Sequence, residues 1–325
     1  MLARQQGIAL VYVLLLFSVI TVMASQMIIG LMNQTRHSSH YLERSQARLY
    51  ALGVEQYLAT VLEANAQDDL KKQRRVDALA EAWNLTAVAF ELEQGSVEIS
   101  VQDEQGLLNM NNLAAQNTLA VQSLRIFQNL LVNHSMDPNL AYRVQDWVDS
   151  DREVSSQGAE DNTYLLASPA YRTANTTMTS LSELRLIQGW FNQSSHSVMP
   201  ELSALPDTTR ININTAPRDV LLALSNQLST AQVDDIIQQR QTQGIDSMEA
   251  LLNIPSLKPQ ANDLQAAPLT FYSQHFSARI KARFRDTEYE MRSWFQVSDR
   301  GEVFITHREV GSPMNPVWSQ GVSAL

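Results

Sequence analysis

The chain has 325 residues, 44% hydrophobic and 18% charged, so it holds enough apolar side chains to bury a core and is not wholly disordered. Its formal net charge of −10 has the wrong sign for a protein that gains affinity by neutralising phosphates, so nucleic acid is not an expected partner. The sequence contains no cysteine, which excludes disulfides, thiolate metal sites and cysteine nucleophiles.

The N-terminal segment is the most apolar part of the sequence. No charged residue occurs from Gln5 to Thr35, and Ile8 to Met32 is about as long as a bilayer-spanning helix. Three interpretations are open: a signal peptide cut after Ala24, a plain single-span anchor, or a prepilin-type signal. In the last type a short basic leader is cut just before the apolar run, here between Gly7 and Ile8, and the apolar helix stays in the mature protein. The apolar run is longer than the core of an ordinary signal peptide, which favours the prepilin type.

Helical spacing of apolar residues continues beyond this segment. It predicts one helix from Ile8 to about Leu62, with a length of roughly 80 Å. The side chains expected on its buried face are Tyr50, Val54, Tyr57, Leu58 and Val61. A helix of this kind, with its lower half in a membrane or filament core and its upper half on a globular head, is typical of a pilin-like subunit.

Strict alternation of apolar and polar residues predicts a β-hairpin over 88–101. The alternation returns only near the C-terminus, where it predicts strands at 278–285, 288–297 and 303–306. The first of these strands has a basic face that would lie beside the acidic face of the second, as a solvated surface of the sheet.

Between the two groups of strands the apolar period is helical. The expected helices are 119–132, 139–148, 180–190, 216–228, 230–241 and 247–252. The polar, Pro-containing stretch 192–209 has the composition of a linker between two helical subdomains. The predicted fold class is therefore α+β: a long N-terminal helix packed on a small antiparallel sheet, with a large all-α domain inserted between the strands.

An acidic loop runs from Asp149 to Asn162. With Asp149 as position one, acidic residues fall at positions three, five and twelve of an EF-hand loop, although Val154 occupies position six, where that loop needs Gly. Oxygen ligands in this pattern suit Ca²⁺, whereas an unliganded acidic surface is the other interpretation. The candidate ligands are Asp149, Asp151, Glu153, Glu160, Asp161 and, more weakly, Asn162.

The sequence also allows two other classes of function to be compared with its motifs, a DNA-binding protein and an enzyme. Residues 211–252 resemble the helix-hairpin-helix units of DNA-binding competence proteins, but the hairpin Ser225 to Leu228 lacks the glycines that bind phosphate, so the unit is interpreted as protein packing. The alternative function is thus a single-span, membrane-anchored periplasmic protein that binds DNA or another ligand through this unit. For an enzyme, the six histidines show no metal-ligand spacing and no nucleophile or nucleotide motif is present, so no catalytic residue is assigned.

Four segments behind the leader carry a family resemblance. They are VQDEQGLLNMNNL (Val101 to Leu113), QDWVDSDREVSSQGAEDNTYL (Gln145 to Leu165), SPAYRTANTTMTSLSELRLIQG (Ser168 to Gly189) and ININTAPRDVLLAL (Ile211 to Leu224). In this order they resemble the minor pseudopilin K family of the type II secretion system, also called general secretion pathway protein K. The resemblance implies a non-catalytic subunit at the tip of a periplasmic pseudopilus, which initiates assembly and helps to export folded proteins across the outer membrane. It also implies structural calcium in the acidic loop.

The resemblance further implies partners and a location. The expected partners are minor pseudopilins I and J, then minor pseudopilin H and the major pseudopilin, the prepilin peptidase, the inner-membrane secretion platform, and the cargo or the outer-membrane secretin. The expected location is the bacterial inner membrane, single-pass, with the N-terminus cytoplasmic and the bulk periplasmic. Cleavage between Gly7 and Ile8 with N-methylation of Ile8 follows from the same resemblance.

The domain organisation can then be stated for the whole chain. It comprises a leader (1–7), a hydrophobic helix (8–35), the pilin-like helix with the first strands (36–105), the inserted helical domain (106–272, with subdomains at about 106–191 and 210–272) and the C-terminal strands and tail (273–325).

Tyr12 is the fifth residue after the predicted cleavage point. Most pilins and pseudopilins have Glu at this position, where the carboxylate is thought to pair with the N-terminal amine of the neighbouring subunit. A subunit with no neighbour above it has no such amine to neutralise. Tyr12 therefore suits a capping subunit, while a plain anchor helix would also tolerate it.

Overall fold

The computed structural model describes residues 6–85, 88–191 and 195–311. One helix, α1 (Gln6–Lys72), accounts for 67 of them and extends for about 100 Å. It confirms the single long helix and continues ten residues past the predicted end, to Lys72. The next residue, Gln73, has a φ of 52° in the left-handed region. Gly7 and Ile8 lie in its first turn, while most of the predicted leader, residues 1–5, lies outside the described residues.

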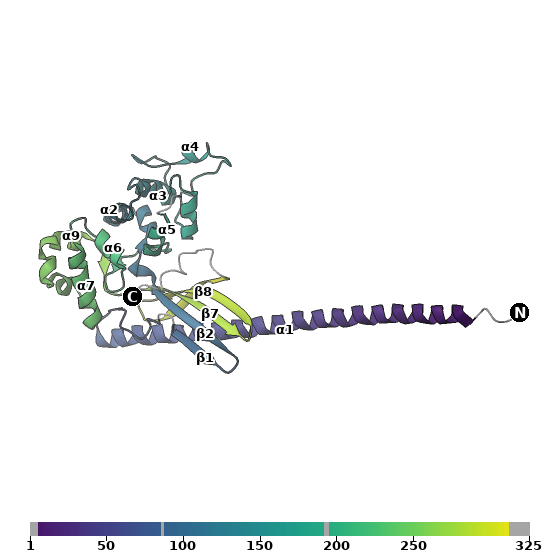
Figure 1. The fold of residues 1–325 in the computed structure, drawn as a ribbon. Helices are drawn as coiled ribbons and strands as arrows, with labels where there is room; N and C mark the ends of the chain where they lie inside the picture. Colours follow the sequence, from purple (N-terminus) through teal and green to yellow (C-terminus); the bar gives the residue numbers. More distant parts are fainter. Residues whose placement is uncertain (1–5, 86–87, 192–194, 312–325) are drawn as a thin grey trace.

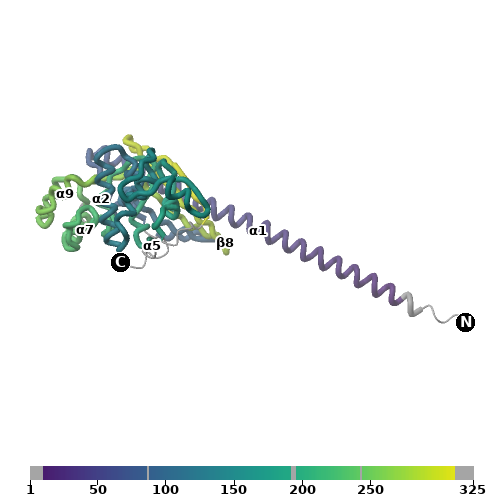
Figure 2. The backbone as a smooth tube through the Cα atoms, turned by 90° about the horizontal axis from the view of Figure 1, so that it is seen from above, coloured from purple at the N-terminus to yellow at the C-terminus, as the bar shows by residue number. Residues whose placement is uncertain are grey.

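The N-terminal half of α1 is exposed along its described residues. It projects as a bare rod from the globular part (Figures 1 and 2). Its most apolar stretch of 18 residues is 0% buried, and the helix is long and apolar enough to cross a membrane. Water does not solvate such a surface favourably, so this half requires a lipid or protein environment.

A five-stranded antiparallel sheet packs along the C-terminal half of α1. Its order is β1-β2-β7-β8-β9. The strands are β1 (Val88–Leu92), β2 (Gly95–Asp103), β7 (His275–Phe284), β8 (Thr287–Val297) and β9 (Val303–Val310). The predicted hairpin and all three predicted C-terminal strands are confirmed. The central strand of the sheet is β7, which pairs with β2 of the N-terminal hairpin.

The buried face of α1 differs from the predicted one. Ala47, Ala51, Glu55, Leu58 and Leu62 are the residues that lie against the sheet. Of the predicted face only Leu58 is fully buried, because small alanine side chains let the helix approach the strands closely, and the bulky tyrosines and valines flank this seam. Tyr57 stays 53% exposed and meets Phe90 edge-on.

The other face of the sheet carries the predicted complementary charges. Arg279 of β7 pairs with Glu290 of β8 at 2.5 Å, and Lys281 pairs with Glu288 at 3.3 Å. Basic residues of one strand thus lie beside acidic residues of the next, as the alternation indicated.

The inserted region joins the end of β2 to the start of β7. Its α-helices are α2 (Thr118–Asn133), α3 (Leu140–Val148), α4 (Asp161–Tyr164), α5 (Ser195–Val198), α6 (Arg218–Ala223), α7 (Thr230–Gln243), α8 (Met248–Leu252) and α9 (Ala261–Ala266). Between them lie 3₁₀ turns η1 (Glu104–Gly106), η2 (Met110–Ala114), η3 (Leu181–Leu186), η4 (Met199–Glu201) and η5 (Pro255–Gln260), and two short parallel pairs, β3 (Leu108–Asn109) with β4 (Leu202–Ser203) and β5 (Ile211–Asn212) with β6 (Leu269–Thr270).

Two of the predicted helices differ in the structure. The helix expected at 180–190 is the 3₁₀ turn η3, which begins with a capping box between Ser180 and Glu183. The helix expected at 216–228 is limited to α6, because the chain turns at Ser225, whose hydroxyl accepts from the amide of Gln227 and donates to Asp263.

The stretch predicted to be a linker is packed into the structure over its described part. Val198, Leu202 and Leu205 are buried, and Leu202 of β4 pairs with Leu108 of β3. The amide nitrogen of the Asn109 side chain adds a hydrogen bond to the Asp207 carbonyl at 2.8 Å. The stretch is polar on average, but these three apolar side chains are buried. The two halves of the inserted region share one continuous hydrophobic core.

Candidate functional site

Tyr12 lies in the bare half of α1, where it is 70% exposed. The first acidic residue after it is Glu43, which is more than seven helical turns further along and lies against the head, where it accepts from the Thr287 hydroxyl at 2.8 Å. The exposed apolar half of the helix therefore carries no carboxylate over its described residues.

The acidic loop connects α3 to α4 at the distal end of the inserted region (Figure 1). It is organised around Asp146, a buried residue of α3 whose carboxylate accepts from the amide of Ser155 at 3.1 Å. Gly158 packs so closely on this carboxylate that an added Cβ would lie 1.9 Å from Asp146 Oδ2. A larger residue here would force the Asp146 carboxylate to shift.

Three oxygen atoms around this loop are buried and have no hydrogen-bond partner: Asp149 Oδ1, Glu160 Oε1 and Asn175 Oδ1. Burial, together with the negative charges of Asp151, Asp146 and Glu160, raises the pKa of Asp149 to about 6. Burial also raises the pKa of Glu160. A group of partner-free oxygens with raised carboxyl pKa values is what a cation would relieve.

The six sequence-derived candidates do not share one environment. Asp149 and Glu160 supply two of the partner-free oxygens. Asp161 is already compensated, since it pairs with Arg172 at 2.9 Å and accepts from the Thr173 amide at 3.1 Å.

The other three candidates are exposed. Asp151 accepts from the amide of Glu153 at 2.8 Å, and the Asn162 side chain accepts from the Thr163 hydroxyl at 3.3 Å. Sequence reasoning missed Asp146 and Asn175. Nothing in the local pattern marks Asn175, which lies 24 residues beyond Asp151 and donates to its carbonyl at 2.5 Å.

The donor set of the loop suits a hard cation, since every partner-free atom is oxygen. Among the described residues, however, no three of the loop's carboxylate oxygens lie within 4.8 Å of one another. A bound cation would have to draw them together.

The helix-hairpin-helix-like unit uses its charged groups internally. Arg240, near the end of α7, is buried and donates to the carbonyls of Ile213 and Ala216 at 3.0 and 2.7 Å. Arg218 pairs with Asp234, and Asp235 accepts from the Ser256 hydroxyl. These contacts fit the predicted packing role, because both arginines bind other groups of the same chain.

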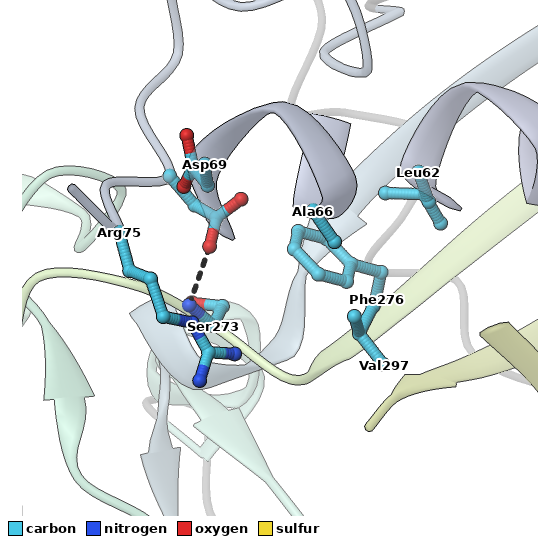
Figure 3. Close-up of a pocket in the computed structure, with 8 residues that line it drawn as sticks. Leu62, Ala66, Asp69, Arg75, Ser273, Phe276 and Val297 are labelled. Carbon is cyan, nitrogen blue, oxygen red and sulfur yellow. Dashed lines mark hydrogen bonds between the residues drawn. The ribbon is translucent and has the colours of Figure 1, made fainter. Parts of the chain in front are cut away.

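A small pocket lies where α1 ends beside the start of β7 (Figure 3). Its volume of about 10 Å³ suits one water molecule rather than a ligand. Its polar wall belongs to a buried network in which Asp77 accepts from the Ser273 amide at 2.8 Å, the contact drawn in Figure 3. Asp103 accepts from the Ser273 hydroxyl and from the side-chain amide of Asn212 at 2.6 and 3.0 Å. Asn65 of α1 donates to Asp77 at 3.2 Å, so the network ties α1, the sheet and the inserted region together.

Comparison with known proteins gives consistent matches. Two family models, both described as "Type II secretion system (T2SS), protein K", match residues 106–207 and 211–271. A type II secretion system protein K of Pseudomonas aeruginosa is 31% identical, over 98% of this chain and 96% of its own length. That of Klebsiella pneumoniae is also 31% identical, over 91% of this chain and 94% of its own length.

A solved structure is similar in fold. It comes from the GspK-GspI-GspJ complex of the enterotoxigenic Escherichia coli type 2 secretion system, with a TM-score of 0.72 and 23% identity. The match covers 86% of this chain and 99% of that one.

Proposed function

The chain belongs to the type II secretion system protein K family, the minor pseudopilins, and we propose that it caps the tip of a periplasmic pseudopilus and initiates its assembly. In this role it is a structural, non-catalytic subunit that helps to export folded proteins across the outer membrane. The membrane-anchored alternative with a DNA-binding helix-hairpin-helix unit gains no support, since Arg240 and Arg218 are engaged within the protein.

The proposed direct partners are minor pseudopilins I and J. The support is the similarity in fold to a protein solved in a GspK-GspI-GspJ complex. Minor pseudopilin H, the major pseudopilin, the prepilin peptidase and the inner-membrane platform complete the proposed set, with the cargo or the secretin as contacts of the tip. The bare half of α1 would cross the inner membrane with its N-terminus in the cytoplasm.

The observation that carries the tip position is Tyr12 in the apolar half of α1, which has no carboxylate over its described residues. A shaft subunit needs an acidic side chain to pair with the amine of the next subunit, and an uncompensated one in a bilayer costs about 3 kcal/mol. A subunit that enters first has no amine to meet, so an uncharged residue at this position avoids that cost.

Replacing Tyr12 tests this proposal. We expect Tyr12→Glu to lose initiation of the pseudopilus and export of a reporter protein, while Tyr12→Phe, which keeps the ring and the neutrality, retains both. Immunoblots would check equal membrane levels of the variants. Unchanged assembly and export in the Tyr12→Glu strain would contradict the tip assignment.

The mature N-terminus tests the processing step separately. Mass spectrometry should find Ile8 as the first residue, with a methylated amine, in cells that contain the prepilin peptidase. A chain that starts at Ser25 would instead indicate a conventional signal peptide and remove the pilus assignment.

The acidic loop is proposed to bind calcium in a structural role. The residues that would hold the ion are Asp149 and Glu160, with the side-chain oxygen of Asn175, because their partner-free oxygens surround the loop. Calcium would supply the positive charge that offsets the mutual repulsion of the carboxylates.

A further inference from the structure

Three side chains from distant segments meet where the two halves of the inserted region join. His134 caps the C-terminus of α2, Glu201 ends η4, and Asp219 lies in the first turn of α6. The Nε2 atom of His134 is 4.0 Å from Glu201 Oε2 and 3.8 Å from Asp219 Oδ2, and one possible ligand atom from each residue lies within 4.8 Å of the other two.

Two of these atoms are buried without a partner. The side chains of His134 and Glu201 are each only 10% exposed, and neither His134 Nε2 nor Glu201 Oε2 makes a hydrogen bond. A buried polar atom in this condition costs about 1–3 kcal/mol. The large majority of buried side-chain polar atoms have a partner, so these two atoms require an explanation.

The spacing fits a metal ion better than a direct contact. Hydrogen bonds need about 2.7–3.2 Å between heavy atoms, which is shorter than both distances from His134 Nε2. Two ligands of a tetrahedral Zn²⁺, each about 2.0–2.2 Å from the metal, lie roughly 3.4 Å apart. To reach that value, the 4.0 and 3.8 Å separations from His134 Nε2 would shorten by about 0.6 and 0.4 Å, and the separation of the two carboxylates, which is within 4.8 Å, by at most about 1.4 Å.

The other ring nitrogen of His134 is already held. Its Nδ1 lies 2.9 Å from Ser197 Oγ. With the proton on Nδ1, donated to this hydroxyl, Nε2 presents its lone pair toward the two carboxylates. A histidine held by a hydrogen bond at its second nitrogen is the usual arrangement of metal-binding imidazoles.

We propose that His134, Glu201 and Asp219 bind one Zn²⁺ ion. A neutral imidazole and two carboxylates together balance the charge of the dication. Asp219 is 44% exposed, which leaves a path for the ion and for water at a fourth position. The nitrogen ligand of His134 distinguishes the metal preference of this site from that of the acidic loop, whose ligands are all oxygen, because Ca²⁺ takes oxygen ligands.

The bound ion would hold three elements together. It would tie the end of α2 to the start of α6 and to the segment 195–209, in place of two carboxylates that repel each other. The proposal depends on these residues alone and is independent of the tip position and of export.

Zinc binding to the full chain in detergent tests the proposal. After treatment with a chelator, titration calorimetry with ZnCl₂ should show one tight site, and Zn²⁺ should raise the melting temperature. Glu201→Gln, which keeps the shape of the side chain, and His134→Ala should each lower the affinity at least about tenfold. Co²⁺ in place of Zn²⁺ should give a visible absorption spectrum that His134→Ala abolishes.

Matched controls locate the site. His196→Ala removes an exposed histidine of α5 and Glu91→Gln removes an exposed carboxylate of β1, and both should keep wild-type zinc affinity. Circular dichroism of Glu201→Gln checks that its fold is retained. The proposal is overturned if the wild-type chain binds no zinc stoichiometrically, or if Glu201→Gln and His134→Ala bind it as tightly as wild type.

Discussion

Asp149 is the residue on which the calcium proposal can be tested most directly. Its carboxylate is half-buried near Asp146, Asp151 and Glu160, and the pKa of about 6 records how unfavourable its charge is without a cation. A ligand that binds only the folded state stabilises it by about 2.7 kcal/mol at a concentration of about 100 times its Kd.

We therefore expect millimolar calcium to raise the melting temperature of the purified protein, and Asp149→Asn to abolish most of that rise. Differential scanning fluorimetry with and without calcium measures both. Glu91→Gln, an exposed change on β1 that removes the same charge, should respond to calcium like wild type. Equal calcium shifts in Asp149→Asn and wild type would rule Asp149 out as a ligand.

The same residues show where sequence reasoning stops. Spacing within one loop identified Asp149 and Glu160, because both lie in a single acidic run. It did not find Asn175, which the fold brings back to the loop, or the meeting of His134, Glu201 and Asp219, which depends on three separate elements. Contacts that arise only from tertiary packing leave no periodic signal along the chain.

At the scale of the elements, the contact between α1 and the sheet contains one buried charge. Glu55 is 3% exposed and accepts from Arg308 of β9 at 2.7 and 2.8 Å and from the Ser293 hydroxyl of β8. A bidentate contact of this kind fixes the position of the helix along the strands as well as its distance from them.

Glu55→Gln should weaken this contact. It leaves Arg308 with a neutral partner, and because that arginine is half-exposed the expected loss of stability is about 2 kcal/mol, below the range for a fully buried pair. Chemical denaturation followed by tryptophan fluorescence measures it. Glu63→Gln, on an exposed face of the same helix, should change stability little, and a similar loss in both variants would contradict a specific role for Glu55.

Helices and strands were predicted well where apolar residues recur with a regular period. The prediction was poorer where it depended on side-chain size or on the polar composition of a segment. The alternation in 88–101 and 278–297 gave strands in the observed places, since half-buried strands impose that pattern. The buried face of α1 differs from the predicted one because the prediction rests on large apolar side chains, whereas the small Ala47 and Ala51 are the ones fully buried. The segment with Val198 and Leu202 has the polar composition of a linker, yet these two apolar side chains are buried.

For the whole molecule, the junction network makes stability depend on pH. Burial, with the charge of Asp103 as a further cause, raises the pKa of Asp77 well above its usual 3.8, and burial also raises the pKa of Asp103. The folded state therefore holds these protons more tightly than the unfolded chain. The contribution of Asp77 is fully present below about pH 4 and is lost as the pH rises through the raised pKa.

We expect Asp77→Asn to gain stability relative to wild type as the pH is raised from about 4 to 7, because the variant cannot ionise. The measurement is the difference between the two melting temperatures across that range. Asp286→Asn, in the exposed turn between β7 and β8, is the control and should show a constant difference from wild type. A constant difference for Asp77→Asn as well would show that the network does not titrate there.

The place of β7 in the sheet has a consequence for the order in which the protein can fold. Its neighbour β2 is made about 170 residues earlier, so β2 presents an unpaired edge until the C-terminal strands emerge. The inserted region has its own core and can condense first, which brings the ends of β2 and β7 together and shortens the loop that must close. The head can thus be completed only late in biogenesis. A chain that stops short of His275 would lack β7, β8 and β9, so only β1 and β2 of the sheet could cover Ala47 and Ala51 of α1.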